Sequence, residues 1–210
     1  MSNKDCWKLV DSVIGNSNRI LLYGAPGTGK TYSAVKQNTP LNLDGEPNVY
    51  QVTMTEDTAS ANLEGFYMPN SSGAFEWHDG IAIQSWRNGG RLVINEIDHA
   101  SPDAMTLPES LPLALKDRFP VKIHVNSIHP KAMEKFPESW HKVIADTSLT
   151  ENMEERISVR SWREFFELVN VKNIDKMISA QLVFGDRGEE LLDAIKLTDL
   201  DVNDYVGEEE

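Results

Sequence analysis

The chain has 210 residues, 40% of them hydrophobic and 25% charged, with a formal net charge of -13. This size fits one globular α/β unit, and an acidic chain without basic clusters argues against nucleic-acid binding, which needs Lys and Arg to displace counterions from phosphates. Cys6 is the only cysteine, which excludes an intrachain disulfide and favours a reducing compartment. No apolar run reaches the length that spans a bilayer, so we expect a soluble, cytoplasmic protein without membrane contact.

The first half of the chain predicts alternating helices and strands. Apolar residues at helical spacing predict a helix from Trp7 to Ile14, stopped by Gly15. Further along, the patterns predict a strand over 19–23, a strand over 49–55, a short helix ending near Gly65, a small hairpin over 71–80, a helix over 81–88 and a strand over 91–98. This alternation is typical of an α/β fold with a parallel sheet and helices on both faces.

A glycine-rich loop, GAPGTGKT, lies between the first predicted strand and a short predicted helix. Strand, loop and helix in this order form a Walker A phosphate loop, whose backbone N–H groups and helix N-terminus bind a polyphosphate such as that of ATP. Lys30 is expected to reach the β- and γ-phosphates, and the Thr31 hydroxyl to hold Mg²⁺. The alternative is a glycine-rich turn with an incidental lysine. The predicted nucleotide-binding residues here are Gly24, Ala25, Pro26, Gly27, Thr28, Gly29, Lys30, Thr31 and Tyr32.

A second polar signal, Asn95-Glu96, ends the apolar run that starts at Arg91. The carboxyl end of a buried strand is where α/β sheets place ligand chemistry. In a Walker B element the first residue supports Mg²⁺ and the glutamate activates the attacking water, so we predict Asn95 as a metal-site residue and Glu96 as a catalytic residue together with Lys30. Asn95 stands where Asp is usual, which removes a negative charge beside the metal, and Asp98 is a candidate to compensate.

The second half of the chain is predicted to be mostly helical. A short helix over 111–116 and a half-buried strand over 121–125 precede His129-Pro130, and apolar residues then recur every three or four positions. We take these stripes as core, including Ile178 and Leu182. The predicted domains are an α/β base over 1–127, a helical lid over 128–198 and an acidic, solvated tail over 199–210 that holds six acids and no base.

With these motifs in place, the chain resembles the AAA+ ATPases, and within them the MoxR/dynein-related branch. The stretch Phe75-Glu76-Trp77-His78-Asp79-Gly80, followed by Gly90-Arg91-Leu92-Val93-Ile94-Asn95-Glu96-Ile97, is similar to the signature of that branch. The resemblance covers about residues 7 to 197.

The resemblance implies an oligomeric ring, usually a hexamer, with ATP between neighbouring subunits. By motif, Arg118 in Asp117-Arg118-Phe119 is similar to the arginine finger that acts in catalysis on the neighbour's γ-phosphate, and Arg160 looks like the sensor 2 arginine that contacts the nucleotide from the lid. The alternatives are an ion pair with Asp117 for Arg118 and a lid salt bridge for Arg160. A protein client, or a von Willebrand factor A type partner, is implied by the resemblance alone.

One part of the family pattern is missing from the sequence. Only 22 positions separate Glu96 from Arg118, where the family has a helix, a strand with the sensor 1 Asn, and a turn. The later candidate, 142–148, has a spacing that favours helix. The sensor 1 strand is therefore predicted to be absent, and an internally deleted or phage-like member of the branch is one interpretation.

The leading functional hypothesis is an ATP hydrolase that drives remodelling of, or chaperone-like action on, a protein partner. The second hypothesis is a nucleotide-binding switch or assembly subunit with little hydrolysis, motivated by Asn95 and the missing strand. A small-molecule kinase with a phosphate loop is a third, which does not explain the predicted lid.

Overall fold

The computed structural model of the chain describes residues 6–97, 119–198 and 200–202. It divides into two compact units. Unit 1 comprises Met1–Trp7, Gly24–Lys30 and His124–Glu210, and unit 2 comprises Lys8–Tyr23 and Thr31–Ile123. Each unit is described by itself.

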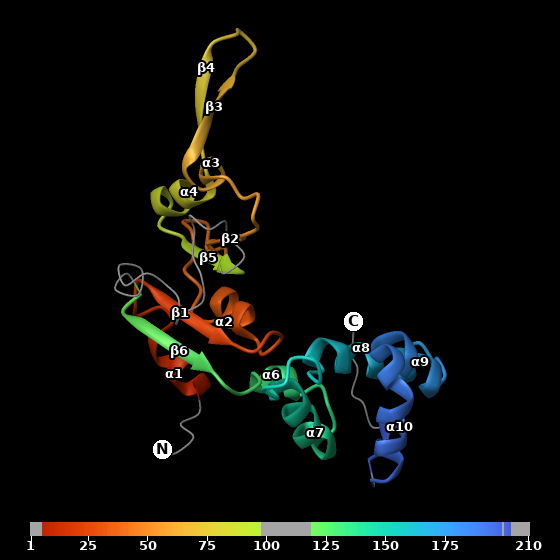
Figure 1. Cartoon of the computed structure of the whole chain (residues 1–210). Coiled ribbons are helices and arrows are strands. Elements are labelled where there is room, and N and C mark those ends of the chain that lie inside the picture. The colour runs from red at the N-terminus through yellow and green to blue at the C-terminus, as the bar shows by residue number, and fades with distance from the viewer. Residues whose placement is uncertain (1–5, 98–118, 199, 203–210) are drawn as a thin grey trace. The chain divides into compact units, whose positions relative to one another are not determined.

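Among the described residues, helices and strands are interspersed up to β6, and only helices follow it (Figure 1). The elements are α1 (Cys6–Val13), β1 (Ile20–Gly24), α2 (Lys30–Lys36), β2 (Val49–Thr53), α3 (Ser60–Glu64), β3 (Gly65–Pro69), β4 (Phe75–Asp79), α4 (Ile81–Arg87), β5 (Arg91–Asn95), β6 (Val121–Val125), α6 (Pro130–Met133), α7 (Glu138–Leu149), α8 (Val159–Asn170), α9 (Lys176–Phe184), η2 (Gly185–Arg187) and α10 (Gly188–Lys196). The predicted α/β fold with a C-terminal helical region is confirmed.

Three pairs of strands make up the sheets of the described residues. β1 pairs with β6, β2 pairs with β5, and β3 pairs with β4. The β2–β5 pair is parallel, with Val49 opposite Arg91 and Thr53 opposite Asn95. Within the described ranges no further strand joins β1 to β5. The later candidate for a sensor 1 strand, 142–148, lies inside α7, so the helical interpretation of that segment is confirmed.

In unit 2, helix α2 runs beside strand β5 and is held to it at both ends. The Thr31 hydroxyl donates to Asn95 Oδ1 at the end of β5. At the start of β5, the Arg91 guanidinium donates to the carbonyls of Ala34, Gln37 and Asn38 at the C-terminal end of the helix. Four strand steps span about 13 Å, and the six helical steps from Thr31 to Gln37 span about 9 Å. The helical segment is therefore shorter than the strand, and the contacts at its two ends fix the position of α2 along β5.

The β3–β4 hairpin extends beyond α3 and α4 (Figure 1). It starts at Gly65, six residues before the hairpin that the sequence predicted. Residues at the predicted start form the turn instead, because the Asn70 side chain accepts from the backbone N–H groups of Ser72 and Ala74 and closes the chain there. Strand β5 ends at Asn95, three residues earlier than predicted, because Glu96 takes a positive φ of 51° that leaves the extended conformation.

The core of unit 1 is an aromatic cluster between α7 and α8. Trp140, Trp162, Phe165 and Phe166 are fully buried, with neighbouring rings 5.0 to 6.2 Å apart. Helix α8 supplies most of this cluster because its apolar residues recur every three or four positions, and Ser158 caps its start by accepting from the Ser161 N–H.

The predicted core is wrong at two positions of α9. Ile178 is 52% exposed and Leu182 is 67% exposed. Helix α9 turns Ser179 and Ala180 inward instead, and both are fully buried. Small residues let the helix backbone lie close to its neighbours, as at Gly188 of α10, where an added Cβ would come within 2.6 Å of the Ala180 backbone.

Candidate functional site

The loop Gly24 to Lys30 lies in unit 1, and its glycines are required by the backbone. Gly24 and Gly29 have φ of 136° and 107°, in the region that favours glycine. A Cβ on Gly24 would collide with the Val125 carbonyl, and a Cβ on Gly29 would lie 2.6 Å from the Cβ of His129. The loop conformation is thus one that other residues would not adopt.

Short hydrogen bonds hold the loop in this shape. The buried Thr28 hydroxyl donates to the Ala25 carbonyl at 3.0 Å, and the His129 N–H donates to the Thr28 carbonyl at 2.9 Å. The Lys30 ammonium donates to the carbonyls of Gly24 at 3.0 Å and Ala25 at 2.6 Å. Lys30, the predicted phosphate-binding cation, therefore lies against the backbone of the phosphate loop.

The start of α8 lies beside this loop within unit 1. A Cβ on Gly27 would be 3.7 Å from both the Ser158 Cβ and the Val159 backbone nitrogen. Arg160 is the next residue, in the first turn of α8, and it is exposed. Arg160 thus follows the two residues of unit 1 that lie beside Gly27, and its sensor 2 role stays a prediction.

In unit 2, two predicted metal-site residues meet. The Thr31 hydroxyl lies 2.9 Å from Asn95 Oδ1 and donates to it. Glu96 follows directly, exposed and with a φ of 51°. A positive φ at a residue other than glycine costs on the order of 1–2 kcal/mol, and such strain concentrates at functional sites. Tyr32, also predicted to bind nucleotide, is 41% exposed on α2.

The donor set fits a magnesium ion held mainly by a bound polyphosphate. Mg²⁺ keeps several waters and takes one or two oxygen ligands from the protein in nucleotide sites. Thr31 Oγ1 and Asn95 Oδ1 are oxygens of this type. Among the described residues no cluster of three or more His, Cys, Asp or Glu side chains is arranged to hold a metal by itself.

Arg91 is a site residue that the sequence did not single out. Its guanidinium donates to the last carbonyls of α2, 2.9 Å from Ala34 O and 2.7 Å from Gln37 O. Burial lowers the pKa of Arg91 from its ordinary value, yet an arginine stays charged. A cation at this end also complements the helix dipole, so Arg91 positions the helix that carries Thr31.

His129 is a second residue that was missed. It is 5% exposed, its Nδ1 accepts from the Lys131 N–H, and its ring meets the buried Trp7 ring edge-on at 4.7 Å. The Trp7 indole N–H donates to the Ser127 carbonyl. Trp7 and His129 thus form the packed floor beneath Gly29. In the sequence, His129-Pro130 indicates only the start of a helix, so it gave no sign that His129 packs against the phosphate loop.

Two expected residues lie outside the described part of the chain. They are Arg118, the predicted arginine finger, and Asp98, the residue expected to compensate for Asn95.

Comparison with known proteins gives the family. Residues 19–158 match the family model of the AAA domain, dynein-related subfamily, so the chain belongs to that family and is an AAA+ ATPase of the dynein-related/MoxR type. Membership implies nucleotide binding and ATP-dependent activity in general. No helix in the described ranges is long and apolar enough to cross a membrane.

The chain is also similar to a curated protein and to a solved structure. The chain is 32% identical to Midasin of Dictyostelium discoideum over 109 residues, which is 50% of this chain and 2% of Midasin. The crystal structure of a candidate ATPase from Cytophaga hutchinsonii aligns with a TM-score of 0.35 and 19% identity, covering 78% of this chain and 57% of the other. The chain thus spans only a small part of the length of the curated relative that it matches.

Proposed function

We propose that the protein hydrolyses ATP to remodel a protein partner. The observation that carries the proposal is the 2.9 Å contact between the Thr31 hydroxyl and Asn95, because it brings the end of the Walker A motif to the end of the Walker B strand. Glu96 follows at the carboxyl end of β5, where a general base belongs in this class of site.

Each residue has a stated role in this proposal. Lys30 neutralises the β- and γ-phosphates, Thr31 and Asn95 support Mg²⁺, and Glu96 orients and deprotonates the attacking water. Bound Mg²⁺ supplies charge neutralisation between the phosphates. Arg160 acts from the lid on the nucleotide of its own subunit, and Arg118 acts on that of the neighbouring subunit.

Phosphate release tests the catalytic part. The wild type is compared with Glu96→Gln, which keeps the size of the side chain and removes the base, and with Lys30→Ala. We expect at least a hundredfold loss with Glu96→Gln, since general base catalysis contributes about 10²–10⁴-fold, while ATP binding measured by calorimetry persists. Equal rates in all three proteins would remove the claim of hydrolysis.

Assembly is the second part of the proposal. We propose a base over 1–127, a lid over 128–198 and a homo-oligomeric ring, a hexamer by resemblance, with a protein client or a von Willebrand factor A type partner. Family membership supports ring formation, because AAA+ proteins usually oligomerise into rings. Electron microscopy with a slowly hydrolysed ATP analogue is expected to show rings that Arg118→Ala weakens. Monomers under these conditions would contradict this part alone.

A nucleotide-binding switch with little hydrolysis is the second candidate function. The specific observation in its favour is Asn95, whose neutral amide oxygen accepts from Thr31 where a carboxylate would attract the metal more strongly. Tight ATP binding and nucleotide-dependent assembly with negligible turnover would favour this function over the first.

A further inference from the structure

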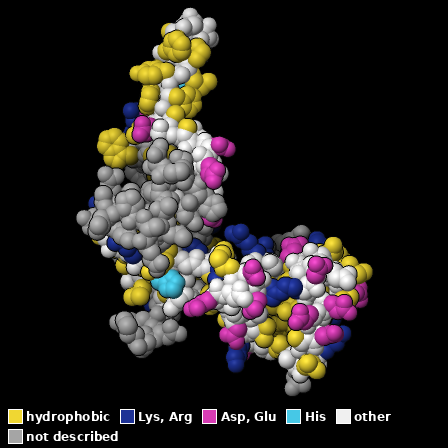
Figure 2. All heavy atoms as spheres, viewed as in Figure 1, with side chains coloured by type: hydrophobic (Ala, Val, Ile, Leu, Met, Phe, Trp, Pro, Cys, Tyr) yellow, Lys and Arg dark blue, Asp and Glu magenta, His cyan; other side chains and the backbone are white. Residues whose placement is uncertain are grey.

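The β3–β4 hairpin of unit 2 exposes large apolar side chains on a small element. Figure 2 shows hydrophobic side chains gathered along it. Their exposed fractions are 43% for Phe66, 66% for Tyr67, 45% for Met68, 72% for Phe75 and 42% for Trp77. A two-stranded hairpin alone is at best marginally stable in water. An exposed apolar surface of this kind typically marks a site where another strand or layer packs.

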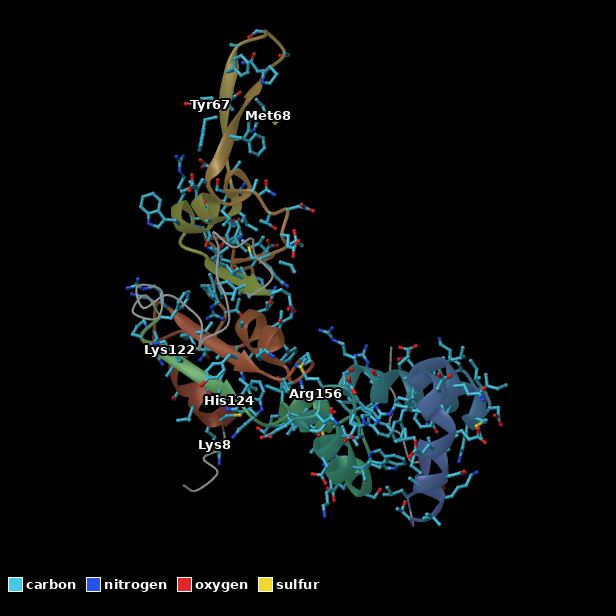
Figure 3. All side chains as sticks on the ribbon, in the orientation of Figure 1. Lys8, Tyr67, Met68, Lys122, His124 and Arg156 are labelled. Carbon is cyan, nitrogen blue, oxygen red and sulfur yellow. The ribbon has the colours of Figure 1, made fainter. Side chains whose placement is uncertain are left out.

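The strand register separates these side chains into two faces. Tyr67 lies opposite Trp77 and Pro69 lies opposite Phe75, so these four share one apolar face, and the Tyr67 and Trp77 rings meet edge-on at 5.1 Å. The other face mixes apolar and polar residues, with Phe66 opposite His78 and Met68 opposite Glu76. Figure 3 shows the neighbours Tyr67 and Met68 on opposite sides of the hairpin.

Backbone hydrogen bonds show which edge of the hairpin is free to pair. The Asn70 N–H donates to the Ala74 carbonyl and the Gly80 N–H donates to the Glu64 carbonyl. These two bonds lie at opposite ends of the hairpin, and both join even-numbered residues. The even-numbered residues of β3 and β4 therefore direct their backbone N–H and C=O groups toward the other strand of the hairpin. Because direction alternates along a strand, Phe75 and Trp77 of β4 direct their N–H and C=O groups away from β3.

The two outer edges differ in their ability to accept another strand. On β3 the outward position at Pro69 has no N–H to donate, which blunts that edge. On the outer edge of β4, Phe75 and Trp77 each have a backbone N–H and a C=O that can pair with another strand. This edge ends at Asp79, whose carbonyl accepts a hydrogen bond from the Gln84 side-chain amide. No third strand pairs with β4 within the part of the chain that the structure describes.

Size and charge narrow the class of partner. An aromatic side chain buries about 150–250 Å², so the exposed fractions correspond to roughly 500 Å² of apolar surface. That is less than the roughly 800 Å² per partner of a standard stable protein interface, but it suits one extended segment. Residues 65–79 contain Glu76 and Asp79 and no Lys or Arg, which disfavours anionic membranes and nucleic acids.

We propose that the outer edge of β4 binds an extended segment of a partner polypeptide as a third strand. Its apolar side chains at alternate positions pack on Phe75 and Trp77 of β4, on the same face of the hairpin as Tyr67. The intervening side chains of the bound segment lie on the opposite face of the sheet, beside Glu76. The negative charge of Glu76 favours Lys or Arg at these positions. This docking surface is independent of the proposed ATPase activity, because none of its residues belongs to the nucleotide site.

The test uses the full chain and a defined probe. The probe is a dye-labelled, terminally blocked seven-residue peptide that alternates valine and lysine, and binding is measured by fluorescence anisotropy at 150 mM salt. A second peptide of the same sequence is N-methylated on alternate valines, which removes strand donors while keeping its charge. We expect the wild type to bind the first peptide at least tenfold more tightly than the second.

Matched Phe→Ser variants separate the two faces. Phe75→Ser, on β4 and on the apolar face, is expected to weaken binding at least fivefold. Phe66→Ser, on the other face, is expected to leave binding within twofold. Hydrogen exchange should slow at Phe75 and Trp77 when the peptide is bound, and Lys30→Ala should bind the peptide as the wild type does.

Three results would overturn the proposal. They are equal binding of the methylated peptide, equal weakening by both serine variants, and preference for anionic vesicles or an oligonucleotide over the peptide. Equal phosphate release by the wild type, Glu96→Gln and Lys30→Ala, with peptide binding intact, would remove the ATPase proposal and leave the docking surface standing. The two proposals therefore fail separately.

Discussion

Arg91 offers a direct test of how helix α2 is held in place. Its guanidinium donates to three carbonyls at the end of α2, and burial lowers its pKa. Arg91→Met keeps most of the aliphatic stem and removes every donor. A hydrogen bond to a charged group contributes about 1.5–3 kcal/mol, but the three bonds share one partly exposed group, so we expect a loss of about 3 kcal/mol rather than the sum.

The matched control is Arg87→Met, four residues earlier. Arg87 forms an ion pair with Asp79 at 3.1 Å, but its side chain is 60% exposed. Exposed pairs contribute about 0.2–1 kcal/mol, so this variant should lose less than about 1 kcal/mol. The loss of unfolding free energy in each variant is measured by urea titration. Hydrogen exchange of residues 30–38 then shows whether α2 itself is destabilised. Equal losses in the two variants would refute the claim that Arg91 anchors α2.

Other substitutions test individual contacts. Ser33→Ala should raise the free energy of unfolding by about 1 kcal/mol, because the buried Ser33 hydroxyl has no hydrogen-bond partner among the described residues and alanine favours helix; a loss measured by urea titration would contradict this. Gly29→Ala should abolish ATP binding in calorimetry, since its Cβ would lie 2.6 Å from the His129 Cβ, and unchanged affinity would show that the loop adapts. Trp140→Ala should cost about 3–5 kcal/mol from loss of a fully buried aromatic ring, and a change below 1 kcal/mol in thermal unfolding would argue against the aromatic core.

Local chemistry made the phosphate loop predictable from the sequence. Gly24 and Gly29 have φ of 136° and 107°, values that glycine adopts without steric cost. The strand that carries Asn95 was predictable for a similar reason, since a short apolar run after a Gly-Gly stop fits a buried strand. The two motifs therefore lie on the loop and the strand that the sequence predicted for them.

Periodicity predicted the helices of unit 1 but not which side of α9 faces inward. Ile178 and Leu182 fit the helical stripe and are exposed, while Ser179 and Ala180 are buried. Hydrophobicity favours burial of the larger side chains, but close approach of neighbouring helices favours small ones. Only the packing of α9 against α8 and α10 decides between the two.

The sequence by itself determined the phosphate loop, the polar end of β5 and the order of the elements, because each depends on residues that are neighbours in the chain. The tertiary structure alone decided which distant residues meet: Thr31 with Asn95, Arg91 with the end of α2, and His129 with Gly29. Such contacts depend on packing between segments that are far apart in the chain. Short-range sequence patterns do not predict which of these segments pack together.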